Sequence, residues 1–155
     1  MSDHDSRPQT WEHIETVRGW LHRCVLDLLR RGQRHDASKL RPPEVEAFDR
    51  LTPKLAATTY GSDEYKALLV ELGPALEHHY RANTHHPEHW PNGVADMSLL
   101  DLLEMVCDWK AAGERHADGG DLMRSIEVNQ ERFGYGDELK SILRATATAL
   151  ANLGA

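Results

Sequence analysis

The sequence is poor in cysteine and has no long apolar run. Its two cysteines, Cys24 and Cys107, lie far apart and form no C-x-x-C pair. A disulfide framework is therefore not expected, and we predict that both thiols are reduced and buried. No apolar segment is long enough to span a bilayer, and no secretory leader is recognisable, so we expect a cytoplasmic protein without a membrane partner.

Positive charge is also scarce. The formal net charge is −7 with histidine taken as neutral, and the 18 lysines and arginines are scattered along the chain. A polyanion would gain little electrostatic attraction, so we expect a small ligand or a protein rather than a nucleic acid as partner. Histidine, in contrast, is abundant: five of the ten histidines fall within residues 78–89, and function should be sought there.

Apolar residues recur at helical spacing along most of the chain, and no run alternates with a period of two. This pattern predicts an all-α fold. The length of 155 residues fits one domain with a core of its own. We therefore expect five to seven helices packed as a single-domain bundle over residues 1–155, with residues 1–8 as a flexible tail.

Glycine, proline and capping residues set the expected limits of these helices. Gly32 suits the end of the first helix, Pro42 and Pro43 can open the second, and the glycine-proline pair at 73–74 should interrupt the third. Ser98 is expected to cap a later helix. The predicted helices are 10–31, 42–48, 63–72, a segment with His78 and His79, 98–112, 121–133 and 137–153, with loops at 52–62 and 84–93.

The first candidate metal ligands lie in and just after the first helix. His13 is at the edge of its apolar face, whereas His22, nine residues later, falls among polar neighbours, so only His13 is expected to point inward. His35 and Asp36 follow the helix end, where the chain can present an imidazole and a carboxylate to one point. Such a pair suits Mn, Fe, Zn or Mg. The alternative is helix punctuation, with Asp36 or Ser38 capping the next segment.

A further candidate comes from the helix at 98–112. Asp101, Glu104 and Asp108 share one face of this helix, opposite its leucines. For Asp101 and Glu104, a solvent-facing acidic stripe is as good an interpretation as a site. Asp108 lies beside Trp109 and two alanines, where a neighbouring helix could approach closely. These neighbours only suggest Asp108 as the candidate from this face.

Together these motifs carry a family resemblance. His13, the sequence HDASK from His35, and Asp108 followed by WKAA resemble the HD-domain superfamily, whose members are all-helical metalloenzymes and usually phosphohydrolases. The resemblance implies an HD-type bundle with His13, His35, Asp36 and Asp108 as metal ligands and Lys39 facing a phosphate. Longer blocks, among them RHDASKL, YGSDEYK and DLLEMVCDWKAA, resemble a short family found in bacteria and phages. That second resemblance implies no activity.

The resemblance also bears on the histidine cluster, because dinuclear HD-domain members bind a second metal through two additional histidines. The candidates here are His78 or His79 for one ligand and His85, His86 or His89 for the other. Adjacent histidines on a helix point about 100° apart, so only one of the first two is expected to bind. We predict two divalent transition-metal ions, chosen from Mn, Fe, Co and Zn. The second ion is bound by His79 and by His85 or His86, and Asp36 is shared between the two ions.

The expected activity is hydrolysis of a phosphate ester, with a nucleotide or another small phosphorylated molecule as substrate. A metal-activated water would attack phosphorus, and Asp36 or a cluster histidine would accept its proton. Lys39 and Arg34 flank the proposed site and are the expected phosphate-binding cations, which makes Asp36 and Lys39 the catalytic candidates. Asn129 shares a helix face with Ser125 and Arg132 and could bind substrate, although a plain polar surface explains that face slightly better.

Two other functions fit the same residues. A dinuclear iron site could activate oxygen, because a histidine-rich site suits iron well. Turnover that depends on oxygen would favour this alternative. The protein could also be a non-catalytic, metal-stabilised binding module, and unfolding on metal loss without turnover of any substrate would favour that one.

Overall fold

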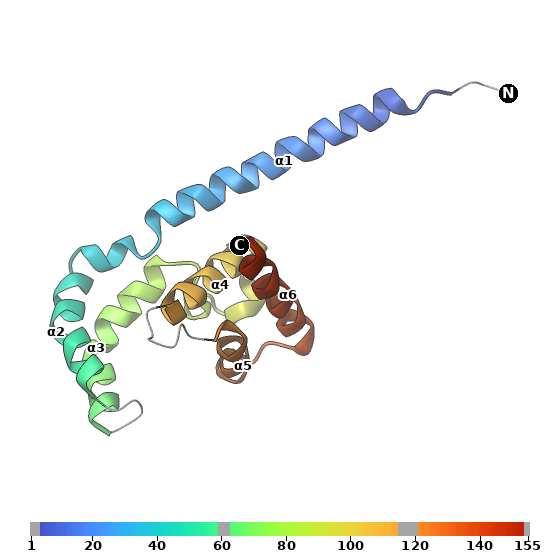
Figure 1. The fold of residues 1–155 in the computed structure, drawn as a ribbon. Coiled ribbons are helices and arrows are strands. Elements are labelled where there is room, and N and C mark those ends of the chain that lie inside the picture. The colour runs from blue at the N-terminus through green and yellow to red at the C-terminus, as the bar shows by residue number, and fades with distance from the viewer. Residues whose placement is uncertain (1–3, 59–62, 115–120, 154–155) are drawn as a thin grey trace. The chain divides into compact units, whose positions relative to one another are not determined.

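The regular elements of the protein are all helical (Figure 1). The computed structural model describes residues 4–58, 63–114 and 121–153, and in these ranges it contains six α-helices, three short 3-10 helices and no strand. The predicted all-α fold is thereby confirmed. Backbone contacts divide the chain into two units, residues 1–35 and 36–155, and the single domain stays a prediction.

The first unit consists mainly of helix α1, Arg7–Arg34. Its 28 residues correspond to about 42 Å at 1.5 Å per residue. It begins inside the segment expected to be a flexible tail and continues past Gly32, since an interior glycine costs a helix only about 1 kcal/mol. No residue of α1 is buried, and Cys24 is exposed. The prediction of a buried Cys24 is therefore wrong, because one helix offers no second layer to cover it.

The second unit contains a pair of helices that lie side by side, α2 (Glu44–Ala57) and α3 (Asp63–Ala82). Both contain a proline, Pro53 and Pro74, where a loop and a helix break were predicted, and those two predictions are wrong. An interior proline costs about 3 kcal/mol. The pair offsets this cost by burying Leu51 and Leu72, each worth about 1.5–3 kcal/mol. Residues 59–62 of the expected loop lie outside the described residues.

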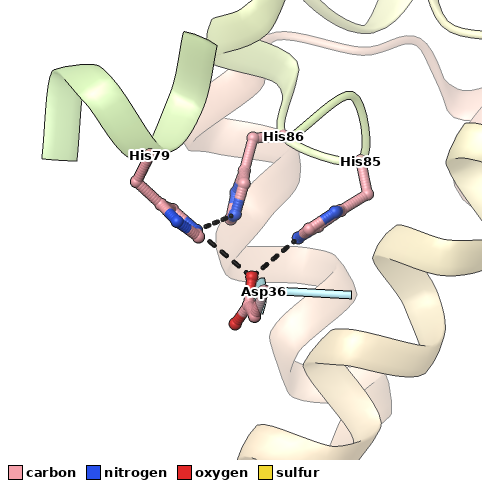
Figure 2. A group of neighbouring side chains, drawn as sticks. All are labelled: Asp36, His79, His85 and His86. Atoms are coloured by element: carbon pink, nitrogen blue, oxygen red, sulfur yellow. Dashed lines mark hydrogen bonds and ion pairs between the residues drawn. The ribbon is translucent and has the colours of Figure 1, made fainter. Parts of the chain in front are cut away.

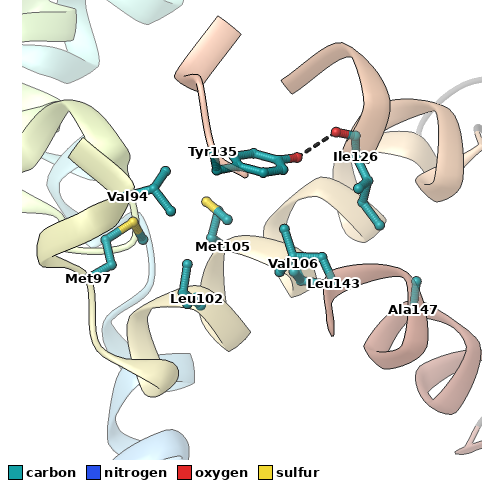
Figure 3. Close-up of a cluster of buried hydrophobic side chains, with 9 residues drawn as sticks. All are labelled: Val94, Met97, Leu102, Met105, Val106, Ile126, Tyr135, Leu143 and Ala147. Carbon is teal, nitrogen blue, oxygen red and sulfur yellow. Dashed lines mark hydrogen bonds between the residues drawn. The ribbon is translucent and has the colours of Figure 1, made fainter. Parts of the chain in front are cut away.

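The remaining helices, α4 (Leu99–Glu114), α5 (Leu122–Phe133) and α6 (Asp137–Leu153), share a larger core (Figure 3). Their limits agree with the prediction to within two residues. Tyr135 is buried in this core and donates its hydroxyl to the Ile126 carbonyl, which satisfies its polar end. Cys107 on α4 is exposed, so its predicted burial is also wrong. The core residues are Val94, Met97, Leu102, Met105, Val106, Ile126, Tyr135, Leu143 and Ala147.

Helix α4 begins with a reciprocal cap, as predicted for Ser98. The Ser98 hydroxyl accepts the Asp101 backbone N–H at 3.2 Å, and the Asp101 carboxylate accepts the Ser98 backbone N–H at 3.0 Å. Asp101 is only 3% exposed. The solvent-facing alternative for Asp101 is therefore wrong, because the chain that leads into α4 folds over this part of the helix.

Candidate metal centre

Four side chains of the second unit bring potential ligand atoms to one point (Figure 2). Each of them offers one atom, and these atoms all lie within 4.8 Å of one another. They reach this point from the turn after residue 35, from α3, and from the loop that follows α3. All four were predicted as metal ligands. They are Asp36, His79, His85 and His86.

Asp36 has an unusual backbone conformation at this point. Its φ of 54° and ψ of 12° place it in the left-handed region, which few residues other than glycine adopt and which aspartate tolerates. Its carbonyl accepts the Lys39 backbone N–H at 2.9 Å, which starts the 3-10 helix η1 (Ala37–Leu40). A strained residue at a convergence of polar side chains is typical of functional sites.

The two oxygens of the Asp36 carboxylate have different partners. Oδ2 accepts the Lys39 ammonium at 2.7 Å, while Oδ1 lies 3.3 Å from His79 Nε2 and 3.5 Å from His85 Nε2. Burial opposes ionisation, but the contacts of the carboxylate with His79, His85 and Lys39 outweigh it and hold the Asp36 pKa well below its usual value. Asp36 is therefore a carboxylate at neutral pH, with Oδ1 directed at the imidazoles.

Lys39 occupies one side of this site. Its Nζ lies 5.3 Å from the centroid of the Phe48 ring, and its side chain is 36% exposed. The ammonium is thus held by a carboxylate and an aromatic face while staying accessible from solvent. Its predicted contact with a phosphate stays a prediction.

His79 is oriented by a buried carboxylate. Glu44 is 0% exposed, and its Oε2 lies 2.9 Å from His79 Nδ1 and accepts the Ser38 hydroxyl at 3.0 Å. Its Oε1 lies 2.6 Å from Nδ1 of His78. Burial opposes ionisation, yet the hydrogen bonds from His78, Ser38 and His79 lower the pKa of Glu44 below its usual value. An ionised Glu44 accepts a hydrogen bond from the N–H at His79 Nδ1, and the other ring nitrogen, Nε2, then faces Asp36.

His85 repeats this arrangement on the other side of Asp36. Its Nδ1 lies 3.2 Å from the carboxylate of Glu104, whose side chain is 12% exposed, and its Nε2 faces Asp36. The solvent-facing alternative for Glu104 is therefore wrong. A histidine whose second nitrogen contacts a carboxylate is the usual arrangement for a metal ligand, because the carboxylate fixes the ring and raises its basicity.

The loop that carries His85 and His86 is anchored to the helices on either side. Thr84 donates its hydroxyl to Asp101 of α4 at 2.7 Å, and Trp90 donates its indole N–H to the Thr84 carbonyl at 2.8 Å. His89 Nδ1 lies 3.0 Å from the Tyr80 carbonyl of α3. The Trp90 side chain also packs against the larger hydrophobic core. The loop also contains two 3-10 helices, η2 (Pro87–His89) and η3 (Gly93–Asp96).

His86 completes the group. Its Nε2 lies 2.9 Å from His79 Nε2, and its ring lies 4.2 Å from the His85 ring between centroids. Burial, with the charges of His85 and His79, lowers the pKa of His86 to about 3, although Asp108 and Asp36 act in the opposite direction. His86 is therefore a neutral imidazole at pH 7.

The proton positions at the centre are constrained by these contacts. Two nitrogens 2.9 Å apart share at most one proton between them, so a neutral His86 can donate from Nε2 to His79. In that arrangement His79 Nε2 has no N–H to donate, and two unprotonated atoms, His79 Nε2 and Asp36 Oδ1, face each other at 3.3 Å. This facing is favourable only with a cation or a further proton between the two atoms. The arrangement can thus hold a metal ion.

The donor set indicates which ions fit. Three imidazole nitrogens and one carboxylate oxygen suit Zn, Fe, Co or Mn, whereas Ca and Mg prefer sites made of oxygen alone. Each of the two most buried imidazoles, His79 and His85, is 1–2% exposed and has a carboxylate at its other nitrogen. The residues present therefore fit a transition-metal ion.

The other predicted site residues lie elsewhere in the sequence, and their roles stay predictions. His13 and Arg34 are part of α1, and His35 caps its C-terminus, so all three belong to the first unit. Asp108 lies on α4, where its carboxylate and a ring nitrogen of His85 come within 4.8 Å of each other. Asn129 is half-buried on α5.

Sequence reasoning missed Glu44 as a residue of this centre. It stands in the first turn of α2, directly after two prolines. An acidic residue there is already explained by the helix dipole, so the sequence gives no signal of a second role. Only its burial and its contacts with two histidines reveal that role.

A comparison with protein families covers nearly the whole chain. The model of DUF5662, a family of unknown function, matches residues 2–153. The chain belongs to the DUF5662 family. Neither the curated proteins nor the solved structures contain a match to this DUF5662 chain. Within the described ranges, none of its helices combines the length and the apolar character that crossing a membrane requires.

Proposed function

We propose that this DUF5662 chain is a metal-dependent phosphohydrolase that acts on a nucleotide or another small phosphate ester in the cytoplasm. The observation that carries the proposal is the convergence of four potential ligand atoms within 4.8 Å. The carboxylates behind His79 and His85 support it, since they direct both Nε2 atoms at the same carboxylate oxygen. The resemblance to the HD-domain superfamily supports the choice of a phosphate ester.

The residues divide into those that hold an ion and those that meet the substrate. Asp36, His79, His85 and His86 would hold a divalent transition metal. When bound, such an ion supplies a Lewis acid and a water of lowered pKa. Lys39 binds a phosphate oxygen through its accessible ammonium and neutralises charge that develops during hydrolysis. A histidine of the cluster accepts the proton of the attacking water, because a carboxylate whose pKa lies well below its usual value, as in Asp36, is a poor base.

The first test is metal content combined with phosphate release. Protein purified without chelator and without an affinity-tag metal is expected to contain a transition metal by elemental analysis. A screen of phosphorylated metabolites with Mn, Fe or Co is expected to show phosphate release that a chelator stops, with nucleotides among the best substrates. Asp36→Ala should lose both metal and activity. The matched control is Asp49→Ala, because Asp49 is an exposed aspartate on α2.

Three results would count against the proposal. Full metal stoichiometry in the Asp36→Ala variant would reject the ligand assignment. Absence of phosphate release from every ester in a metal-loaded protein would reject the hydrolase. Release that requires oxygen consumption would replace the hydrolase with the dinuclear iron oxygenase.

A further inference from the structure

We infer that Glu44 is the positioning residue of this centre, which selects the tautomer of His79 that can bind an ion. The inference rests on the proposed metal centre and deepens it. Glu44 touches none of the reacting atoms. It acts through His79, whose Nδ1 lies 2.9 Å from Glu44 Oε2 and whose Nε2 lies 3.3 Å from Asp36 Oδ1.

The burial of Glu44 is the first reason. Its side chain is 0% exposed, and its ion-pair partners in the described part of the chain are two imidazoles rather than a lysine or an arginine. A buried carboxylate with such partners costs considerable desolvation energy, and an apolar side chain of similar size would often be no worse for stability. Packing alone therefore does not explain a glutamate at this position.

The chemistry of the carboxylate is the second reason. An ionised glutamate only accepts hydrogen bonds, so its contacts with His78 and His79 each place an N–H on Nδ1. Asn83 Nδ2 lies 3.1 Å from His79 Nδ1, but its two hydrogens have closer acceptors in the His79 carbonyl at 2.8 Å and the Ser38 hydroxyl at 2.9 Å. His79 then carries its proton on Nδ1, and Nε2 is left as a lone pair directed at the centre. A glutamine could place its NH2 group toward Nδ1 instead, which would favour the other tautomer with a proton on Nε2.

The contacts that hold Glu44 itself are the third reason. His78 lies 2.6 Å from Oε1, and the Ser38 hydroxyl donates to Oε2 at 3.0 Å. Ser38 lies in η1, two residues after Asp36, so the segment that carries the proposed ligand also fixes the carboxylate. His78 was predicted as an alternative to His79. Its side chain is 33% exposed, and it contacts Glu44 rather than Asp36.

The test compares Glu44→Gln with wild type in the full chain, and Co²⁺ alone is the probe. Loss of a carboxylate that orients a metal-binding histidine typically weakens metal affinity about 10- to 100-fold, and we expect a loss in this range on titration followed by visible absorption. Glu46→Gln is the matched control, since Glu46 is an exposed glutamate on the same helix and should bind Co²⁺ like wild type.

A second measurement separates tautomer selection from a merely structural role. Nitrogen NMR of isotope-labelled histidine in the metal-free protein is expected to find His79 protonated at Nδ1 in wild type and at Nε2, wholly or in part, in Glu44→Gln. A variant that only loosened the fold would broaden many signals without this change. If Glu44→Gln does not fold, His78→Ala serves instead, because it removes the donor that faces Oε1 and should weaken Co²⁺ binding in the same direction.

The outcomes distinguish this inference from the proposed function. If wild type binds Co²⁺ and the folded Glu44→Gln variant binds it equally well with an unchanged His79 tautomer, the positioning role is refuted and the metal centre stands. If wild type binds no Co²⁺, the metal centre and this inference are refuted together. Weaker binding with the shifted tautomer supports both.

Discussion

Replacing Asp36 with asparagine is the sharpest perturbation of the proposed centre, because it removes one charge and preserves the shape of the side chain. An ion that binds only the folded protein stabilises it by about 2.7 kcal/mol at 100 times its Kd. For a chain of this size 1 kcal/mol corresponds to about 2–4 °C in Tm. Wild type should therefore gain about 5–10 °C on saturation with the metal, and Asp36→Asn should gain almost nothing.

The same substitution should change the metal-free protein far less. There it removes the Lys39 ion pair, a contact of 2.7 Å in which the lysine side chain is 36% exposed. Pairs of this exposure contribute about 0.2–1 kcal/mol, so a Tm change of no more than a few degrees is expected. The metal-dependent part of the Tm shift thus reports on the ligand role, and the metal-free part on the ion pair.

Thermal unfolding with Co²⁺ or Zn²⁺, and again with excess chelator, measures both parts. Each titration should extend to 100 times the Kd found for wild type. Asp49→Asn on the exposed side of α2 is the matched control and should keep the full metal-dependent shift. The reasoning fails if Asp36→Asn keeps that shift, or if wild type has no shift in a protein that elemental analysis finds to contain the metal.

Two further predictions concern the histidines. The sequence predicts a second ion besides the one that these histidines would hold, so substituting His79 and His86 together with alanine should lower the metal content from two ions per chain to one while the helical content is retained. A wild-type count of one that the double variant leaves unchanged would contradict the two-ion prediction. In the metal-free protein His86 has a pKa of about 3 against an ordinary value of 6.5, so the unfolded chain binds a proton in this window that the folded chain does not. Urea midpoints should therefore fall as the pH is lowered from about 6.5 toward 3, and a rise over that window would refute the assignment of a neutral His86.

The success and failure of the helix predictions have one physical origin. The helices from residue 98 onward were predicted nearly to their ends because apolar spacing and the Ser98 cap are local signals. The signals at Pro53 and Pro74 are also local, but there the packing of α2 against α3, in which Leu51 and Leu72 are buried 21 residues apart in the sequence, offsets them. A prediction based on proline considers only the hydrogen bond that the helix loses and ignores the stabilisation by packing against a neighbouring helix.

The candidate ligands of the second unit could also be predicted because their signals are local. Asp36 belongs to a short motif, and His79, His85 and His86 belong to a dense run of histidines, so local density pointed at residues that the fold does bring together. Sequence geometry also limited the pair at 78 and 79 to one inward residue. His79 is 1% exposed and His78 is 33% exposed at the side chain, which agrees with that choice.

Glu44 and Glu104 could not be identified from the sequence in this way, although it could be foreseen that buried histidines need hydrogen-bond acceptors. A buried imidazole needs a partner for each nitrogen, and a metal-binding one needs an acceptor at the nitrogen that does not bind. Two buried histidines therefore require two acceptors, but nothing local says which. Glu44 precedes His79 by 35 residues and Glu104 follows His85 by 19, and each has a sufficient local explanation, as a helix-dipole partner or as part of an acidic stripe. The burial of Glu44 and Glu104 depends on how η1 and the loop after α3 pack against the helices. This packing is determined by the fold of the whole second unit. The candidate ligands can thus be found from motifs, whereas the contacts of Glu44 and Glu104 with them are identified only from the folded structure.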